Sequence, residues 1–173
     1  MCLDVAEMLD YAKGRNSRES IVNRRELMSA ALAVGGAAVL APNAMAKTAP
    51  IDTSKKAGVA LGGVDVVAYF TEKTSKPGKP EFKTHWKDVD WYFSSAENMQ
   101  AFIAAPEKFA PQYGGYCAYA TAKGGVAAGD PQVWSVVDGK LYINLSDAVK
   151  KLWVQDIPGN IAKANKNWPT LSQ

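Results

Sequence analysis

The length, composition and charge of the chain are those of an ordinary globular protein. The 173 residues are 47% hydrophobic and 21% charged, which excludes disorder throughout and is typical of one domain with a tail. The net charge of +3 comes from 20 basic and 17 acidic residues mixed along the chain, without the clustered basic face that binds nucleic acid. The single histidine, His85, severely limits any mechanism that needs a histidine triad or a multi-histidine metal site.

The first 46 residues are predicted to be a cleavable export signal. The pair Arg24-Arg25 precedes a mildly apolar run over residues 30–40, and Ala44-Met45-Ala46 supplies a small-x-small cleavage site. This order of features is similar to a twin-arginine (Tat) signal. The apolar run is shorter than the roughly 20 residues that cross a bilayer, so we expect a periplasmic mature protein without a permanent membrane span. Met1 and Met8 both fit as the start of translation.

The rest of the chain divides into a lead-in and one domain. Residues 47–58 are aperiodic and contain Lys, Thr, Ser and Pro, which predicts a flexible lead-in to a domain over residues 59–173. Asp65 lies inside the first apolar run of this domain. We expect its carboxylate either to cap a helix or to point inward as a polar group held for a reason. Residues 71–80 carry Lys, Pro and Gly and are predicted to form a surface loop.

A β-hairpin and a helix are predicted next. Aromatic and β-branched residues at 82–86 and 89–93 flank a polar turn, which is typical of a hairpin. Alternation along the first of these strands places His85 on the solvent face. Ser94-Ser95-Ala96-Glu97 has the form of a capping box, so a helix is expected through Ala105. Its buried face is expected to carry Met99, Phe102 and Ile103.

The C-terminal part of the chain is predicted to hold a second hairpin. A Gly-rich loop is expected over residues 121–130. The apolar runs 133–137 and 140–145 then pair across Asp138-Gly139, a strong hairpin signal. Two hairpins interleaved with short helices predict an α+β fold in one small domain.

Two helices are expected to close the domain. Ser146 is predicted to cap a helix that runs to about residue 155, because apolar residues recur there at helical spacing. A last helix is expected to end before Trp168-Pro169, because the residue before a proline is disfavoured in a helix.

Residues 106–120 concentrate the special chemistry of the chain. A short helical turn is expected from Pro106, and three tyrosines, a glycine pair and Cys117 lie within this stretch. Cys117 is the only cysteine left after cleavage at residue 46, so it has no partner for a disulfide within the mature chain. Adjacent glycines predict positive φ or a close approach that a Cβ would block. The candidate binding residues are Tyr113, Gly114, Gly115, Tyr116 and Asp65.

Several segments together resemble the exported YHS-domain proteins of bacteria. They are 65–70, 91–94, 106–109 with Phe102, the core Tyr113-Gly114-Gly115-Tyr116-Cys117-Ala118, and 138–144. The resemblance covers nearly the whole mature chain. It implies a small α+β domain related to the metal-binding YHS and TRASH modules of metal-handling proteins. The metal-binding modules carry a cysteine after the Tyr-Phe of the second strand, where this chain has Ser94 and Ser95, and another in the following helix, which here has none.

Three functions follow as hypotheses. The first is a periplasmic metal-handling protein in which Cys117 supplies a thiolate and His85 or Met99 a second ligand, a set that suits copper as Cu(I). The second is a metal-free binding or structural module, whose tyrosines and tryptophans form a core or a pocket for a small apolar ligand or a partner protein. The third is a thiol enzyme in which His85 activates Cys117, although no known nucleophile motif surrounds this cysteine.

Overall fold

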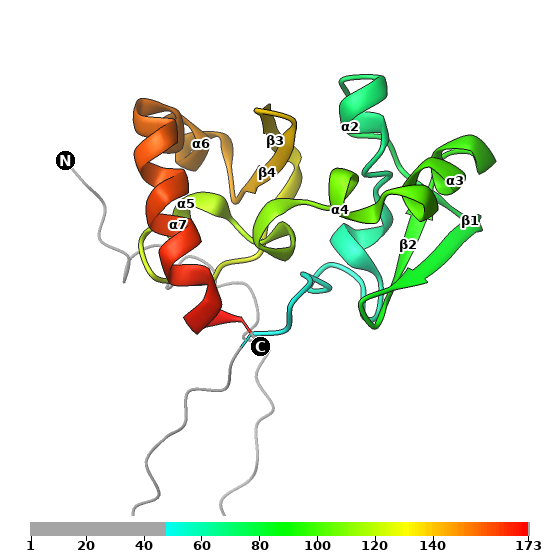
Figure 1. The fold of residues 1–173 in the computed structure, drawn as a ribbon, viewed down its shortest axis with the longest axis horizontal. Helices are drawn as coiled ribbons and strands as arrows, with labels where there is room; N and C mark the ends of the chain where they lie inside the picture. The colour runs from blue at the N-terminus through cyan, green and yellow to red at the C-terminus, as the bar shows by residue number, and fades with distance from the viewer. Residues whose placement is uncertain (1–47, 173) are drawn as a thin grey trace, which may run out of the picture.

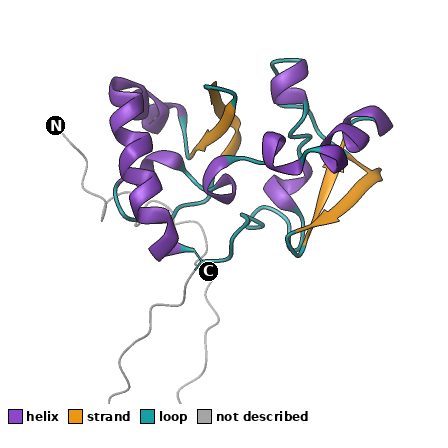
Figure 2. Ribbon diagram, in the orientation of Figure 1, coloured by secondary structure: helices purple, strands orange, loops and turns teal. Residues whose placement is uncertain are grey.

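The computed structural model describes residues 48–172, and the predicted export signal over residues 1–46 lies outside them. Figure 1 shows two halves joined by the lead-in and by helix α4 (Pro106–Phe109). The N-terminal half, residues 59–109, contains one β-hairpin, and the C-terminal half, residues 110–172, contains the other. Figure 2 shows helices beside each hairpin, with the first hairpin at the outer edge of the N-terminal half. The predicted α+β fold with two antiparallel hairpins is therefore confirmed.

The first hairpin forms where the sequence predicts it. Strands β1 (Lys79–Trp86) and β2 (Val89–Phe93) pair antiparallel, with Trp86 opposite Val89. The turn residues Lys87 and Asp88 have φ of +52° and +61°, the left-handed pair that matches the twist of a tight hairpin. His85 is exposed and Trp86 is half-buried, so the predicted alternation is confirmed.

Two short helical segments precede this hairpin, and helix α3 (Ala96–Ala104) follows it. The 3₁₀ segment η1 (Ala60–Gly63) and helix α2 (Ala68–Thr71) come first. A serine caps α3, but one residue later than the predicted capping box places it: the Ser95 hydroxyl accepts the backbone N–H of Asn98, whereas the Ser94 hydroxyl donates to Asp65. Phe102 is buried, but Ile103 is 49% exposed, so its predicted place on the buried face is wrong. The next residue in a helix lies about 100° further around the axis, which carries Ile103 past the narrow buried stripe.

The second hairpin and its cap are also confirmed. Strands β3 (Asp130–Val137) and β4 (Lys140–Asn144) pair across Asp138 and Gly139, whose φ values are +49° and +71°. The Ser146 hydroxyl accepts the N–H of Val149 and begins helix α6 (Asp147–Trp153). A 3₁₀ turn, η3 (Val154–Asp156), leads from α6 into the last helix.

Two predictions about the C-terminal half are wrong. Residues 121 and 122 were expected in a loop but belong to helix α5 (Ala118–Ala122), which follows the 3₁₀ segment η2 (Gln112–Gly115). Helix α7 (Ile157–Leu171) does not end before Trp168 but continues through Pro169. A proline near a helix end removes only one hydrogen bond, and here Ser172 closes the last turn by donating its N–H to the Trp168 carbonyl.

The lead-in is packed against the domain from Thr48 onward, where the sequence predicted a flexible segment. Thr48 donates its N–H to the Leu171 carbonyl at 3.0 Å. Ile51 and Asp52 are buried, and the Asp52 carboxylate accepts the N–H groups of Ser54 and Gly129. One buried apolar side chain and one satisfied carboxylate are enough to fix this segment.

The apolar core continues from one half of the molecule into the other. The largest cluster lies around Trp91, Phe93 and Phe102 of the N-terminal half and also takes in Leu141 and Ile143 from β4. A second cluster packs α5, α6 and α7 around the buried ring of Trp153. Within residues 48–172, no helix combines the length and the apolar character needed to cross a membrane.

Candidate binding cleft

Asp65 caps a helix and also points inward, so it has both of the roles that were expected as alternatives. Its side chain is fully buried. The Oδ1 atom accepts the N–H groups of Val67 and Ala68 at the start of α2. The Oδ2 atom accepts the Ser94 N–H and hydroxyl and the Asn98 amide at 2.7–2.8 Å. Asp65 therefore fixes α2 to the beginning of α3, and this arrangement leaves the carboxylate a structural group.

The glycine pair adopts the positive φ that the sequence predicts. Gly114 and Gly115 have φ of +62° and +88°. A Cβ on Gly114 would overlap the Pro50 carbonyl, and a Cβ on Gly115 would lie 2.5 Å from the Leu61 side chain. Tyr113, directly before them, also has a positive φ of +54°. The backbone here lies against the lead-in, with the Asp52 N–H donating to the Gly114 carbonyl at 2.8 Å.

Cys117 lies in a small apolar cluster just before α5. Its side chain is fully buried among Ala120, Ala127 and Val149. The thiol lies 3.8 Å from Oδ1 of Asn144, a buried amide whose Nδ2 has no partner within the described part of the chain. Burial raises the pKa of Cys117, against the smaller opposing effect of the backbone N–H groups of Ala120, Leu145 and Tyr119. The thiol is therefore held in its neutral form.

The structure does not bring the three proposed metal ligands together. His85 is exposed on β1, where its Nδ1 lies 3.0 Å from the Asp90 carboxylate. Met99 is partly buried against the core of the N-terminal half, whereas Cys117 belongs to the cluster beside β4 in the other half. Residues 48–172 contain no group of three or more His, Cys, Asp or Glu side chains that could hold a metal ion. In the described residues, the Cys117 thiol therefore lies apart from the imidazole and the thioether that were predicted to join it.

The separation of Cys117 from His85 also argues against the thiol-enzyme hypothesis. A nucleophilic cysteine needs a base within hydrogen-bond reach or a lowered pKa. His85 pairs with Asp90 on the other hairpin, and the pKa of Cys117 is raised. This geometry supplies neither form of activation.

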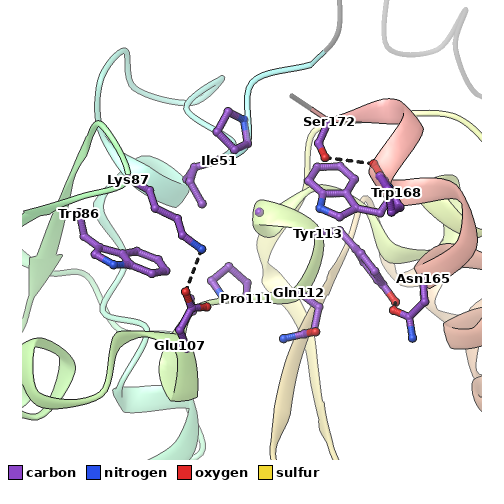
Figure 3. A pocket seen from close by; sticks show the side chains of 14 residues that line it. Ile51, Trp86, Lys87, Glu107, Pro111, Gln112, Tyr113, Asn165, Trp168 and Ser172 are labelled. Carbon is purple, nitrogen blue, oxygen red and sulfur yellow. Dashed lines mark hydrogen bonds and ion pairs between the residues drawn. The ribbon is translucent and has the colours of Figure 1, made fainter.

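A cleft of about 440 Å³ lies between the two halves, and Figure 3 shows its walls. The residues that line it are Pro50 and Ile51 of the lead-in, Trp86 and Lys87 of the first hairpin, Glu107 of α4, the segment 110–114, Asn165, Trp168 and Pro169 of α7, and Ser172. Its volume falls in the range of small-molecule sites, about 300–1,000 Å³. Two of the candidate binding residues, Tyr113 and Gly114, line it.

The wall from the N-terminal half carries an ion pair in front of an indole ring. Lys87 Nζ lies 3.0 Å from Glu107 Oε1 and 4.2 Å from the centroid of the Trp86 ring. Trp86 is supported from behind by Trp91 and Phe102, with ring centroids 5.7 and 5.6 Å away. The ammonium group is thus fixed by a carboxylate and by the face of an aromatic ring.

The opposite wall is aromatic and is built on α7. Trp168 packs against Tyr113 and Tyr116, with ring centroids 6.0 and 5.9 Å away. The Tyr113 hydroxyl donates to Asn165 Oδ1 at 2.9 Å, and burial raises the pKa of this tyrosine. The Ser172 hydroxyl donates to the Trp168 carbonyl at 3.0 Å. Figure 3 shows that the Gln112 amide lies at the base of the cleft, between the two walls.

The sequence reasoning missed most of this cleft. The sequence pattern indicated Tyr113 and Gly114 but not Trp86, Lys87, Glu107 or Trp168. A signal existed in the two tryptophans, because Trp86 ends a strand and Trp168 stands before a proline, positions at which a large ring is often only half-buried. Their proximity could not be inferred, since they come from different halves of the chain. Searches of protein-family models, of curated proteins and of solved structures found no match to this chain.

Proposed function

We propose that this protein is an exported, metal-free binding module that takes a small ligand into the cleft between its two halves. The observation that carries the proposal is the cleft itself, which has a volume of about 440 Å³. One of its walls is aromatic and the other carries an ion pair. Such a site, with aromatic rings and a few fixed polar groups, is what a small-molecule pocket requires. Export by the twin-arginine route is part of the proposal and rests on the sequence pattern alone.

The groups around the cleft support a site that exists before the ligand arrives. Gly114 is held against the lead-in by the bond from Asp52, and Tyr113 is held to α7 through Asn165. Both walls are packed on core residues. A preorganised site loses less conformational entropy when it binds, which favours affinity for a small ligand.

The experiment is a screen of small fragments by ¹⁵N-labelled NMR of the mature protein. Fragments are expected to shift the amide signals of residues 111–114 and 165–172, and Gln112→Ala is expected to weaken the best of them. Ile103→Ala is the matched control, because Ile103 is exposed on α3 and does not line the cleft. Fragment shifts that map elsewhere, or that Gln112→Ala leaves unchanged, contradict the proposal.

A further inference from the structure

The charges in the cleft indicate an uncharged ligand. Among the described residues that line it, Lys87 and Glu107 are the only charged side chains, and they form an exposed ion pair of 3.0 Å. The Lys87 ammonium is also engaged with the Trp86 ring. An anion or a cation in the cleft would have to compete with one member of this pair. A neutral ligand can instead hydrogen-bond to both members and leave the pair intact.

The polar groups indicate a ligand that carries several hydroxyl or amide groups. Gln112 has an amide with two donors and one acceptor. Asn165 uses Oδ1 to accept the Tyr113 hydroxyl, and its Nδ2 can still donate. Glu107 meets Lys87 through Oε1, and its Oε2 is a further acceptor. A purely apolar ligand would desolvate these groups without replacing their bonds to water, at a cost of free energy.

The aromatic wall adds a requirement of shape. Trp168 is half-buried, and its ring is backed by Tyr113 and Tyr116. A ring supported in this way presents a fixed flat surface, against which a ligand with a flat apolar face can stack. One class of compound combines no charge, many hydroxyl groups and a flat face of C–H bonds, namely the pyranose sugars with equatorial substituents.

We propose that the cleft binds neutral pyranose saccharides, with one sugar ring stacked on Trp168 and its hydroxyl groups bonded to Gln112 and the Lys87–Glu107 pair. This inference rests on the proposed function, because it assumes that the cleft is a binding site. It narrows that function by naming the ligand class. It differs from the expectation of a small apolar ligand, around which the polar groups of the cleft would lose their bonds to water.

The test is a titration of the mature protein with cellotriose and with triacetylchitotriose, followed by NMR and calorimetry. Trigalacturonic acid, which is similar in size but charged, serves as the comparison ligand. At least one neutral trisaccharide is expected to shift the signals of residues 111–114 and 165–172 and to bind about tenfold more tightly than the charged one.

Variants connect the binding to the named residues. Trp168→Ala is expected to weaken the neutral saccharide about tenfold, consistent with the value of a stacked aromatic contact. Gln112→Ala and Glu107→Gln, which disturb the fold less, are each expected to weaken it severalfold. Glu81→Gln is the matched control, because Glu81 is an exposed carboxylate on β1 that does not line the cleft. The affinity of this variant for the neutral saccharide is expected to equal that of the wild type.

The outcomes separate this inference from the proposed function. If fragments bind in the cleft but neither neutral trisaccharide does, the saccharide inference is overturned and the binding function stands. If neither fragments nor saccharides bind there, both are overturned. Saccharide binding that survives Gln112→Ala and Glu107→Gln unchanged also overturns the inference, because the ligand would then lie at another place.

Discussion

Asp65 is buried as a carboxylate because five donors surround it. Those donors are the N–H groups of Val67, Ala68 and Ser94, the Ser94 hydroxyl and the Asn98 amide. In Asp65→Asn, one oxygen becomes an NH₂ group that faces other donors. We expect the free energy of unfolding to fall by about 2–4 kcal/mol, measured by urea denaturation.

Asp156→Asn is the matched control for that substitution. Asp156 also accepts a backbone N–H, that of Gly159 at the start of α7, but it is exposed. Asparagine caps helices about as well as aspartate, so we expect a loss below about 1 kcal/mol. An equal fall in the free energy of unfolding of the two variants would mean that the buried network around Asp65 adds no stability beyond that of an exposed cap.

Gly114 and Gly139 separate the cost of backbone strain from the cost of a steric overlap. Both have positive φ, but a Cβ on Gly139 has open space around it, whereas a Cβ on Gly114 meets the Pro50 carbonyl. Gly139→Ala is expected to cost about 1 kcal/mol, the price of left-handed φ alone. Gly114→Ala is expected to cost more and to lower the melting temperature further. Thermal denaturation that gives identical shifts for both would refute the close packing at Pro50.

Cys117 provides the test of the copper hypothesis. Because its thiol is neutral and buried among apolar groups, Cys117→Ser is expected to lower the free energy of unfolding by about 1–3 kcal/mol. Copper and zinc content, measured after incubation with Cu(I) under reducing conditions, is expected to be equal in the two proteins. Stoichiometric copper in the wild type that disappears in Cys117→Ser would restore the metal-handling hypothesis.

At the scale of single elements, the hairpin β1–β2 carries a pH dependence. The hydrogen bond from His85, followed by the bond from Lys83, lowers the pKa of Asp90 below its ordinary value of 3.8. The charged carboxylate therefore stabilises the fold above about pH 4, and that contribution is lost as the pH falls through the lowered pKa. We expect Asp90→Asn to flatten the fall in stability between about pH 4 and pH 2. Asp88→Asn, in the adjacent turn, is the control and should keep the slope of the wild type in urea denaturation at each pH.

Both hairpins, the Ser146 cap and, to within one residue, the start of α3 could be predicted because their signals are local. Alternating apolar residues mark the strands, and Asp138-Gly139 marks the second turn. The first turn lacks glycine, yet Lys87 and Asp88 take positive φ because the flanking strands impose it. Ser95 and Ser146 cap their helices through their own side chains, so neither depends on distant residues.

The elements that were missed depend on contacts between distant residues. Helix α5 has five residues and no side-chain cap, and it is held by Asn167 of α7, which donates to the Thr121 and Ala122 carbonyls. Ile51 is buried in the main apolar cluster, and Asp52 bonds to Gly114 and Gly129, which are distant from it in the sequence. The cleft has the same origin, since its walls come from segments that meet only in the folded protein. Periodicity and turn signals carry no information about such tertiary contacts between distant segments.

At the scale of the whole molecule, the proposed export signal can be tested independently of the cleft. We expect Arg24→Lys combined with Arg25→Lys to leave the uncleaved protein in the cytoplasm, because both charges remain but the twin-arginine pattern is lost. Arg15→Lys combined with Arg18→Lys is the control, since it makes the same chemical change outside the motif. Cell fractionation and immunoblotting measure both. Normal periplasmic processing of the first variant would exclude the twin-arginine route.

The pairing of Thr48 with Ser172 has a consequence for the order of events during synthesis. Thr48 donates its N–H to the Leu171 carbonyl and forms a parallel bridge with Ser172, so nearly all of the described chain lies between the two partners. The ribosome must add Ser172 before this contact can form, and closing so long a loop is among the later steps of folding. The bond at Thr48 therefore forms after the contacts of Ile51 and Asp52, whose partners are made earlier. The bond between Thr48 and Leu171 thus reports that the last helix has been made and has docked.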